Sequence, residues 1–218
     1  MKNLNEIIFN NTLFYNISKE DIELLLKDLN AEKKHYLKNE TIFYTDETIK
    51  DFGIVLSGTI NIIKEDFDGN NTLLVQVKRG EMFAEAFVFG ELPLTVLAEA
   101  AEETHVLWIN YKNIFNGRHD NYDSRFIFIS NLMKAFAKKT VFLTRRIEHL
   151  SKRTIKEKVL SYLNEQSGRQ KKHNFDIPLN RQELADYLSV DRSALSAVLS
   201  KLKDEGVIDF HKNNFKLT

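Results

Sequence analysis

Cysteine is absent from the 218-residue sequence, and long hydrophobic runs are absent as well. Without cysteine the chain can form no disulfide, no thiol redox switch and no cysteine-held iron–sulfur cluster. No apolar run approaches the roughly 20 residues of a membrane-spanning helix. The opening residues, MKNLNEIIFNN, lack the apolar core and cleavage site of a secretory signal peptide. We therefore expect a cytoplasmic protein that has no membrane partner.

The formal net charge is zero, but the charges are unevenly distributed. Residues 1–130 carry 13 Lys and Arg against 21 Asp and Glu, whereas residues 131–218 carry 18 against 10. A basic segment is typical of proteins that bind a polyanion such as nucleic acid. A chain of this length can form two modest domains, each with its own core. Nucleic-acid binding is therefore expected in the C-terminal part of the chain.

The clearest local pattern lies between Asn180 and Glu205 and predicts two short helices. Asn180 and Glu183 have the spacing of a capping box at the start of the first helix. Ser189-Val190 interrupts the pattern, and Asp191 is placed to cap the second helix. The apolar face of the second helix consists of Leu195, Val198, Leu199 and Leu202. Such a pair is either a DNA-binding helix-turn-helix or an ordinary helical hairpin within a core.

The segments on either side favour the DNA-binding interpretation. After the helix pair, Val207–Phe210 and Phe215–Leu217 are predicted strands around the polar turn Lys212–Asn214. A β-hairpin at this place forms the wing of a winged helix. Before the pair, a helix is expected over Thr154–Leu163, followed by a polar loop at Ser167–Lys172.

A different periodicity fills the N-terminal half of the chain. Residues 1–30 are expected to be helical, with Ser18 as a helix cap. From His35 to Asn110, short β-rich runs alternate with turn signals. The runs are Thr41–Tyr44, Phe52–Leu56, Thr59–Ile63, Thr72–Val77, Thr95–Ala98 and Val106–Ile109. Strands of this length and spacing predict an antiparallel sandwich or barrel.

A long helix is predicted from Tyr122 to Leu150, and it carries two apolar stripes. The first stripe has the alternating spacings of three and four that a coiled coil requires. It consists of Phe126, Ile129, Met133, Phe136, Thr140, Leu143 and Ile147. The second stripe, expected to pack on the chain's own barrel, consists of Phe128, Leu132, Ala135 and Phe142. We interpret the first stripe as the seam of a homodimer; the alternative is a core helix with two buried faces.

A barrel, a long helix and a winged helix in this order resemble the Crp/Fnr family of bacterial transcription regulators. The most specific segments are Phe52–Phe83, similar to the family's barrel hairpins, and the helix pair at Asn180–Ile208. The resemblance implies an α+β protein with a double-stranded β-helix (jelly-roll) sensor barrel in residues 1–120. It further implies a dimerisation helix in residues 121–150 and a winged helix-turn-helix in residues 151–218. The implied partners are double-stranded DNA, a second copy of the chain and RNA polymerase.

The resemblance also assigns roles at the DNA. The residues that match the family's base-contacting positions are Arg192, Ser193, Ser196 and Ala197. Members of the family often have Glu at the position of Ser193 and Arg at that of Ala197, so their operator is not carried over. The expected phosphate contacts are Asn180, Arg181, Gln182 and Lys201. The dimer is expected to read an inverted repeat.

The effector site departs from that of the cyclic-nucleotide-binding relatives. In those relatives a short helix opens with Gly-Glu, and an Arg-Ser pair follows on the next strand. Here Glu85 is kept, but Ala84 replaces the glycine, and Leu94 and Thr95 stand where Arg-Ser would be. A buried phosphate without its arginine partner costs several kcal/mol. We expect a barrel pocket around Glu85, Leu94 and Thr95 that does not bind cyclic AMP; its effector is unidentified, and a regulator without an effector is the alternative.

Histidines are the remaining candidates for metal or heme chemistry. The six are His35, His105, His119, His149, His173 and His211. One histidine can hold heme iron axially, so heme stays open, but we expect ordinary surface or interface residues. A cupin-type metal enzyme, which shares the double-sheet barrel, needs several histidines inside it. Only His35 and His105 fall in the predicted barrel, neither is expected to have a second histidine nearby, and no metal site or catalysis is expected.

Overall fold

The computed structural model describes residues 4–66, 69–116 and 122–218. The chain divides into two compact units, Met1–Ala135 and Phe136–Thr218. The division falls within helix α5 (Tyr122–Leu150), which has the limits that the sequence predicts. His119 and the domain limit expected after residue 120 lie outside the described residues. Among the helices that the structure describes, none is long and apolar enough to cross a bilayer.

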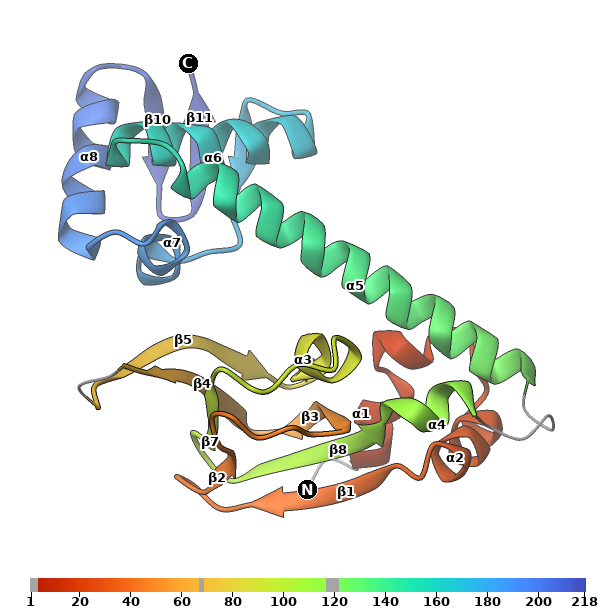
Figure 1. The fold of residues 1–218 in the computed structure, drawn as a ribbon. Coiled ribbons are helices and arrows are strands. Elements are labelled where there is room, and N and C mark those ends of the chain that lie inside the picture. Colours follow the sequence, from red (N-terminus) through yellow and green to blue (C-terminus); the bar gives the residue numbers. More distant parts are fainter. Residues whose placement is uncertain (1–3, 67–68, 117–121) are drawn as a thin grey trace. The chain divides into compact units, whose positions relative to one another are not determined.

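Two four-stranded antiparallel sheets form the N-terminal unit (Figure 1). One sheet has the order β1 (Glu32–Tyr36), β8 (Thr104–Asn110), β3 (Asp51–Ser57) and β6 (Met82–Phe83). The other has the order β2 (Thr41–Phe43), β7 (Leu97–Ala100), β4 (Thr59–Glu65) and β5 (Asn71–Lys78). The jelly-roll fold is thus confirmed, and each of the six predicted runs overlaps an observed strand.

Two strands of these sheets, β1 and β6, were not predicted. Strand β1 reads Glu-Lys-Lys-His-Tyr and is exposed over four of its five residues, so it has no alternation of apolar side chains. It is a strand because it pairs with β8 from Glu32↔Trp108 to Tyr36↔Thr104. Strand β6 has only two residues, too few for a periodic signal.

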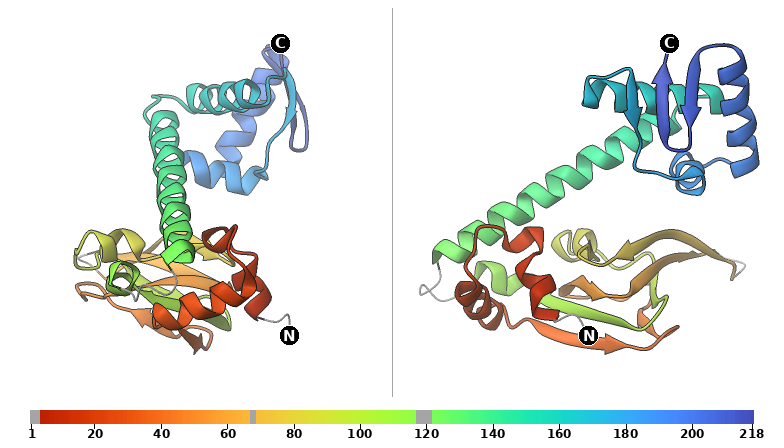
Figure 2. Two further views of the ribbon diagram at one scale, coloured as in Figure 1. Left: turned by 90° about the vertical axis from the view of Figure 1, so that its right-hand side faces the viewer. Right: turned by 180° about the vertical axis from the view of Figure 1, so that it is seen from behind.

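The predicted N-terminal helix is divided into three pieces. These are α1 (Leu4–Phe9), the 3₁₀ helix η1 (Thr12–Phe14) and α2 (Lys19–Asp28). Asn16, between η1 and α2, has a φ of 64°, in the left-handed region, so the two helices cannot be continuous. Ser18 caps α2 by accepting a hydrogen bond from the Asp21 backbone N–H at 3.1 Å, as predicted. Figure 2 shows these pieces beside the sheets, and α3 (Glu85–Phe89) and α4 (Tyr111–Phe115) complete the unit.

Buried polar side chains fix the first half of α5 to the N-terminal unit. The guanidinium of Arg125, 9% exposed, lies 3.5 Å from the Asp28 carboxylate and donates to the carbonyls of Asn113 and Ile114. Asn131 donates to the carbonyls of Leu13 and Tyr15 at 3.2 and 2.8 Å. A buried donor that loses such a partner costs about 1–3 kcal/mol, so these contacts hold the helix in one place.

The C-terminal unit is a winged helix. It contains α6 (Ile155–Gln170), α7 (Arg181–Leu188) and α8 (Arg192–Asp204). Its sheet has the order β10 (Ile208–His211), β11 (Asn214–Leu217) and β9 (Asn174–Asp176). The fully buried core side chains come from the three helices and β11: Val159, Leu163, Leu184, Ala185, Leu188, Leu195, Leu199, Leu202 and Phe215.

The prediction of a polar loop at Ser167–Lys172 is wrong for most of these residues. Helix α6 continues to Gln170, and Lys171 ends it with a φ of 52°. The polar composition misled the prediction, because polar side chains of this last turn have partners: Ser167 donates to the Lys172 carbonyl at 2.7 Å, and Gln170 donates to the Asp176 carbonyl at 2.8 Å. After the turn, Phe175 is buried in β9, the third strand of the wing sheet.

Candidate nucleic-acid interface

Hydrogen bonds at the starts of α7 and α8 define the helix-turn-helix. Asn180 accepts from the Glu183 backbone N–H at 3.0 Å, and Glu183 accepts from the Asn180 backbone N–H at 2.8 Å. This capping box is the one predicted. Ser189 follows α7 with a φ of 50°, so the chain turns at once. Asp191 then caps α8 by accepting from the backbone N–H groups of Ser193 and Ala194 at 2.8 and 2.9 Å.

Helix α8 has one buried face and one exposed face. Leu195, Leu199 and Leu202 are 0% exposed. All four candidate base-contacting residues lie on the exposed side: Arg192, Ser193, Ser196 and Ala197. Positions i, i+1, i+4 and i+5 form a single strip along a helix, so the four can face one groove together.

The two serines of this strip use their hydroxyl protons within the helix. Ser193 donates to the Asp191 carboxylate, and this bond holds the pKa of that carboxyl below its usual value. Ser196 donates to the Arg192 carbonyl at 2.9 Å. Each hydroxyl therefore presents lone pairs outward, which suits donors such as the amino groups of adenine and cytosine. Among the described residues, no ion pair or hydrogen bond occupies the Arg192 guanidinium.

The four candidate phosphate contacts differ in their surroundings. Asn180, Gln182 and Lys201 are exposed. Arg181 is partly buried against the stacked rings of Phe210 and Phe215, 4.8 and 4.9 Å from their centroids, and donates to the Lys212 carbonyl at 3.0 Å. Burial lowers the pKa of this guanidinium. Arg181 thus joins the start of α7 to the wing, a structural role that its sequence position does not reveal.

Next to Arg181 the surface is hollowed by about 620 Å³. The lining is polar and comes from α7 and the wing: Asp176, Asn180, Arg181, His211, Lys212, Asn213 and Asn214. A shallow polar hollow with two cationic side chains at a helix start is suited to a phosphate of the DNA backbone.

Replacing Arg181 should therefore affect stability, and replacing Lys201 should not. We expect Arg181→Gln to lower the free energy of unfolding by about 1–3 kcal/mol, because two cation–π contacts and a hydrogen bond are lost. Lys201→Gln, at an exposed position, should stay within about 0.5 kcal/mol. Thermal and urea unfolding measure both. An Arg181→Gln protein as stable as the parent would leave Arg181 with the phosphate role alone.

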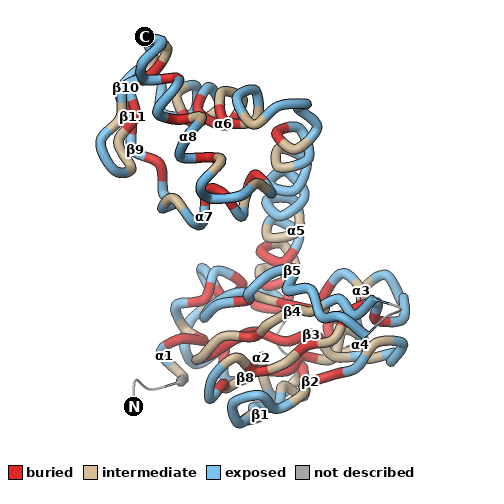
Figure 3. Tube along the Cα trace, turned by 90° about the vertical axis from the view of Figure 1, so that its left-hand side faces the viewer, coloured by how far each residue is buried: buried red, intermediate tan, exposed pale blue. Residues whose placement is uncertain are grey.

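The predicted seam of α5 is incompletely covered within one chain (Figure 3). Four of its side chains are strongly exposed: Phe126 at 64%, Met133 at 67%, Leu143 at 46% and Ile147 at 66%. Ile129 and Phe136 are half-buried, and Thr140 is exposed. Such large apolar side chains in water favour a partner surface.

The second stripe of α5 was predicted to pack on the barrel, and only its first residues do so. Phe128 and Leu132 are buried in the N-terminal unit, at 0% and 4% exposure. Phe142 instead lies against Tyr187 of α7, with the ring centroids 5.8 Å apart. The stripe therefore contributes to both units, because α5 belongs to both.

The expected effector residues do not lie together on one open surface. Glu85 begins α3 and is 1% exposed. Leu94 is 0% exposed within the apolar cluster that contains Phe43, Phe83 and Trp108, whereas Thr95 is exposed. Ala84 has a φ of 64°, a conformation that favours glycine. The chain path of the Gly-Glu turn is thus retained without its glycine.

Histidines give two corrections. His35 and His105 lie opposite each other on β1 and β8, with ring centroids 4.6 Å apart, so the expectation that neither has a histidine nearby is wrong. The His35 side chain is 44% exposed, outside the barrel core. His149 is 2% exposed and hydrogen-bonds to Ser161 and Glu165, unlike a surface histidine. The described residues include no group of three or more potential metal ligands.

Known proteins resemble the chain over most of its length. A family model described as a cyclic nucleotide-binding domain matches residues 33–118, and one described as a Crp-like helix-turn-helix domain matches residues 157–218. The cAMP-activated global transcriptional regulator CRP of Pasteurella multocida is 20% identical over 181 residues, covering 81% of this chain and 85% of the relative.

Solved structures share the fold. CprK complexed with OCPA has a TM-score of 0.64 at 19% identity, covering 89% of this chain and 88% of that one. The c-di-GMP responsive regulator CLP of Xanthomonas campestris has a TM-score of 0.56 at 19% identity, covering 92% and 99%. The two family models occur in the order in which the barrel and the winged helix lie along the chain.

Proposed function

Since the chain belongs to the Crp/Fnr family of transcription regulators, we propose that it acts as a homodimer that reads an inverted-repeat operator. It is a DNA-binding regulator whose N-terminal domain is of the effector-binding class. The observation that carries the finer proposal is the strip of Arg192, Ser193, Ser196 and Ala197, exposed along a helix whose other face is buried. In a dimer, two such strips meet half-sites about one helical turn apart. RNA polymerase is the proposed partner at the promoter.

Dimerisation through α5 is supported by the exposed seam. Phe126, Met133, Leu143 and Ile147 recur with coiled-coil spacing and are between 46% and 67% exposed. Burying such side chains against an identical helix contributes about 25 cal/mol per Å² of apolar surface. Two α5 helices packed along this seam would also fix the spacing of the two reading helices.

Selection of bound sequences from a random DNA pool, at fixed salt, tests the proposal. We expect enrichment of an inverted repeat with half-site centres about 10 base pairs apart. Enrichment of a single half-site or of a direct repeat would contradict the two-fold arrangement. Failure to enrich any sequence, with the protein folded and dimeric, would contradict sequence-specific reading.

We further propose that the barrel responds to an effector other than cyclic AMP. The arginine that holds the cyclic phosphate in cyclic-nucleotide-binding relatives is replaced by Leu94, which is fully buried among apolar side chains. Phe83 and Trp108 lie edge to face in the same cluster, with centroids 5.2 Å apart. An anionic phosphate brought next to them would lose its hydration without an ion-pair partner.

Isothermal titration with cyclic AMP should therefore give no saturable heat at concentrations up to about 1 mM. The lost phosphate contact is worth several kcal/mol, enough to move a micromolar site into the millimolar range. A cAMP-activated relative, titrated in the same buffer, serves as the positive control. Micromolar binding by this chain would overturn the proposal.

A regulator that always binds DNA is the second candidate. Glu85 is 1% exposed but already has an interaction within the chain, so its burial does not distinguish the two candidates. Operator affinity measured with and without a small-molecule extract of the native host distinguishes the two. A changed affinity at constant salt supports an effector, and an unchanged one supports constitutive binding.

A further inference from the structure

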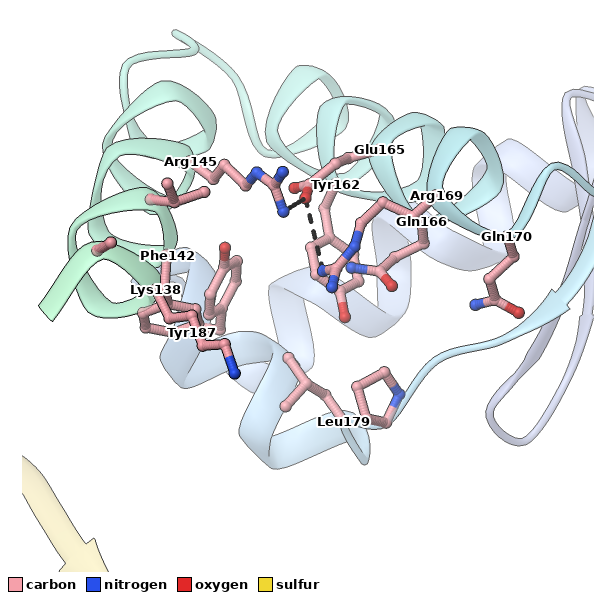
Figure 4. A pocket seen from close by; sticks show the side chains of 13 residues that line it. Lys138, Phe142, Arg145, Tyr162, Glu165, Gln166, Arg169, Gln170, Leu179 and Tyr187 are labelled. Carbon is pink, nitrogen blue, oxygen red and sulfur yellow. Dashed lines mark ion pairs between the residues drawn. The ribbon is translucent and has the colours of Figure 1, made fainter. Parts of the chain in front are cut away.

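The C-terminal unit contains a cavity of about 880 Å³ that is separate from the barrel. It lies between the second half of α5, the face of α6, the segment Pro178–Leu179 and Tyr187 near the end of α7 (Figure 4). Its lining includes aromatic, cationic and polar side chains: Lys138, Phe142, Tyr162, Gln166, Arg169 and Tyr187. This volume is in the range of small-molecule sites.

Positive charge predominates around the cavity. Lys138, Arg145 and Arg169 line it against a single carboxylate, Glu165. The Arg145 and Arg169 guanidinium groups are 3.2 and 3.7 Å from that carboxylate (dashed in Figure 4). Lys138 has no ion pair among the described residues. The cationic side chains therefore exceed the anionic one by two, which favours a ligand with negative charge.

Two buried polar groups of α6 face the same space. Gln166 is 8% exposed and Tyr162 is 3% exposed, and both line the cavity. Within the part of the chain that the structure describes, neither the Gln166 amide nor the Tyr162 hydroxyl has a hydrogen-bond partner. Burial raises the pKa of Tyr162, so its phenol stays a neutral donor. Their polar atoms are not among the fully buried, unpartnered side-chain atoms of the described residues, so they stay open to the cavity, where a ligand can reach them.

Aromatic rings form the apolar part of the lining. Phe142 and Tyr187 have their centroids 5.8 Å apart, and Tyr162 and Tyr187 have theirs 5.3 Å apart. The rings come from three helices, so they meet only in the folded unit. Aromatic pairs at these distances favour stacking or edge contact with a further ring.

We propose that this cavity binds a small aromatic carboxylate. Its carboxylate would meet Lys138 and Arg169, its ring would lie against Phe142 and Tyr187, and Gln166 and Tyr162 would donate to its polar atoms. The site is distinct from the barrel pocket, and it does not depend on the proposed operator. A ligand here contacts α5, α6 and α7 at once, so it binds next to the helix that precedes the reading helix.

Titration of the full-length protein with 2-naphthoate tests the site, with the neutral 2-naphthamide as the matched control ligand. We expect saturable naphthoate binding below about 1 mM and naphthamide binding at least about tenfold weaker, because the charge-assisted contacts are lost. The Lys138→Gln/Arg169→Gln double variant should weaken naphthoate about tenfold or more. Lys172→Gln, at an exposed lysine that does not line the cavity, should leave it unchanged.

A second variant keeps the volume but removes a polar group. Gln166→Leu should weaken naphthoate binding by about fivefold, with the melting temperature unchanged, because the Gln166 amide makes no hydrogen bond within the described residues. No saturable binding, equal binding of the amide, or binding unaffected by both the double variant and Gln166→Leu would overturn the proposal. Unchanged DNA affinity in any of these variants leaves the assignment intact, because the readout is ligand binding.

Discussion

Leu143→Glu is expected to convert the protein to monomers and to weaken operator binding by about 100-fold or more. The substitution places a carboxylate in each helix in the C-terminal part of the seam, where pairing would bury two like charges. A dimer gains its affinity because the second half-site binds in an intramolecular step, an advantage of about 10²–10⁴. Sedimentation equilibrium should then report the 25.4 kDa chain mass rather than twice that value.

Val141→Glu is the matched control for this result. Val141 and Leu143 are 47% and 46% exposed and lie two residues apart on α5, but only Leu143 belongs to the seam. The same charge at Val141 should leave the dimer intact and the operator affinity within about threefold. Monomers from both variants would indicate that α5 tolerates no carboxylate in this turn. A dimer in both would refute the seam.

Arg192→Ala is expected to relax base discrimination at one base pair in each half-site by about 1–3 kcal/mol, a factor of roughly 5 to 150. Arg192 is the first residue of α8, it is exposed, and no side chain among the described residues holds it. It can therefore present two donors to guanine O6 and N7. Competition assays with single base-pair variants of the selected operator, at one salt concentration, measure the change.

Lys201→Gln provides the contrast for Arg192→Ala. Lys201 is exposed on α8, about one turn beyond the base-contacting strip, where a phosphate contact is expected. Its loss should weaken all sequences equally and reduce the salt dependence by about one phosphate contact. The same uniform weakening in Arg192→Ala would reassign Arg192 to the DNA backbone, and an unchanged affinity would remove it from the interface.

The elements that were predicted well are those stabilised by residues close in the chain. The capping box joins Asn180 to Glu183, and the cap of α8 joins Asp191 to Ser193 and Ala194. These pairs are two or three positions apart, so their spacing is visible in the sequence. The strip of candidate base contacts follows in the same way, because the period of a helix fixes which residues share its exposed side.

The features that were missed depend on residues far apart in the chain. Strand β1 has a polar, exposed sequence and exists through its pairing with β8, about 70 positions later. The same pairing brings His35 beside His105. The last turns of α6 were expected to be a loop because their composition is polar. The polar side chains there have partners beyond the helix, since the Gln170 amide donates to the carbonyl of Asp176 in β9.

Sequence alone was sufficient for the fold class, the reading helix and the exposed α5 stripe, since each is a periodic pattern of apolar and polar side chains. Only the tertiary structure revealed the role of Arg181 as a link between α7 and the wing, and the cationic cavity with its unpartnered Gln166 and Tyr162. The physical reason is that periodicity reports which face of an element is buried. Periodicity does not report which side chains from other elements pack against that face. Hydrogen bonds, ion pairs and cavities depend on those contacts between elements.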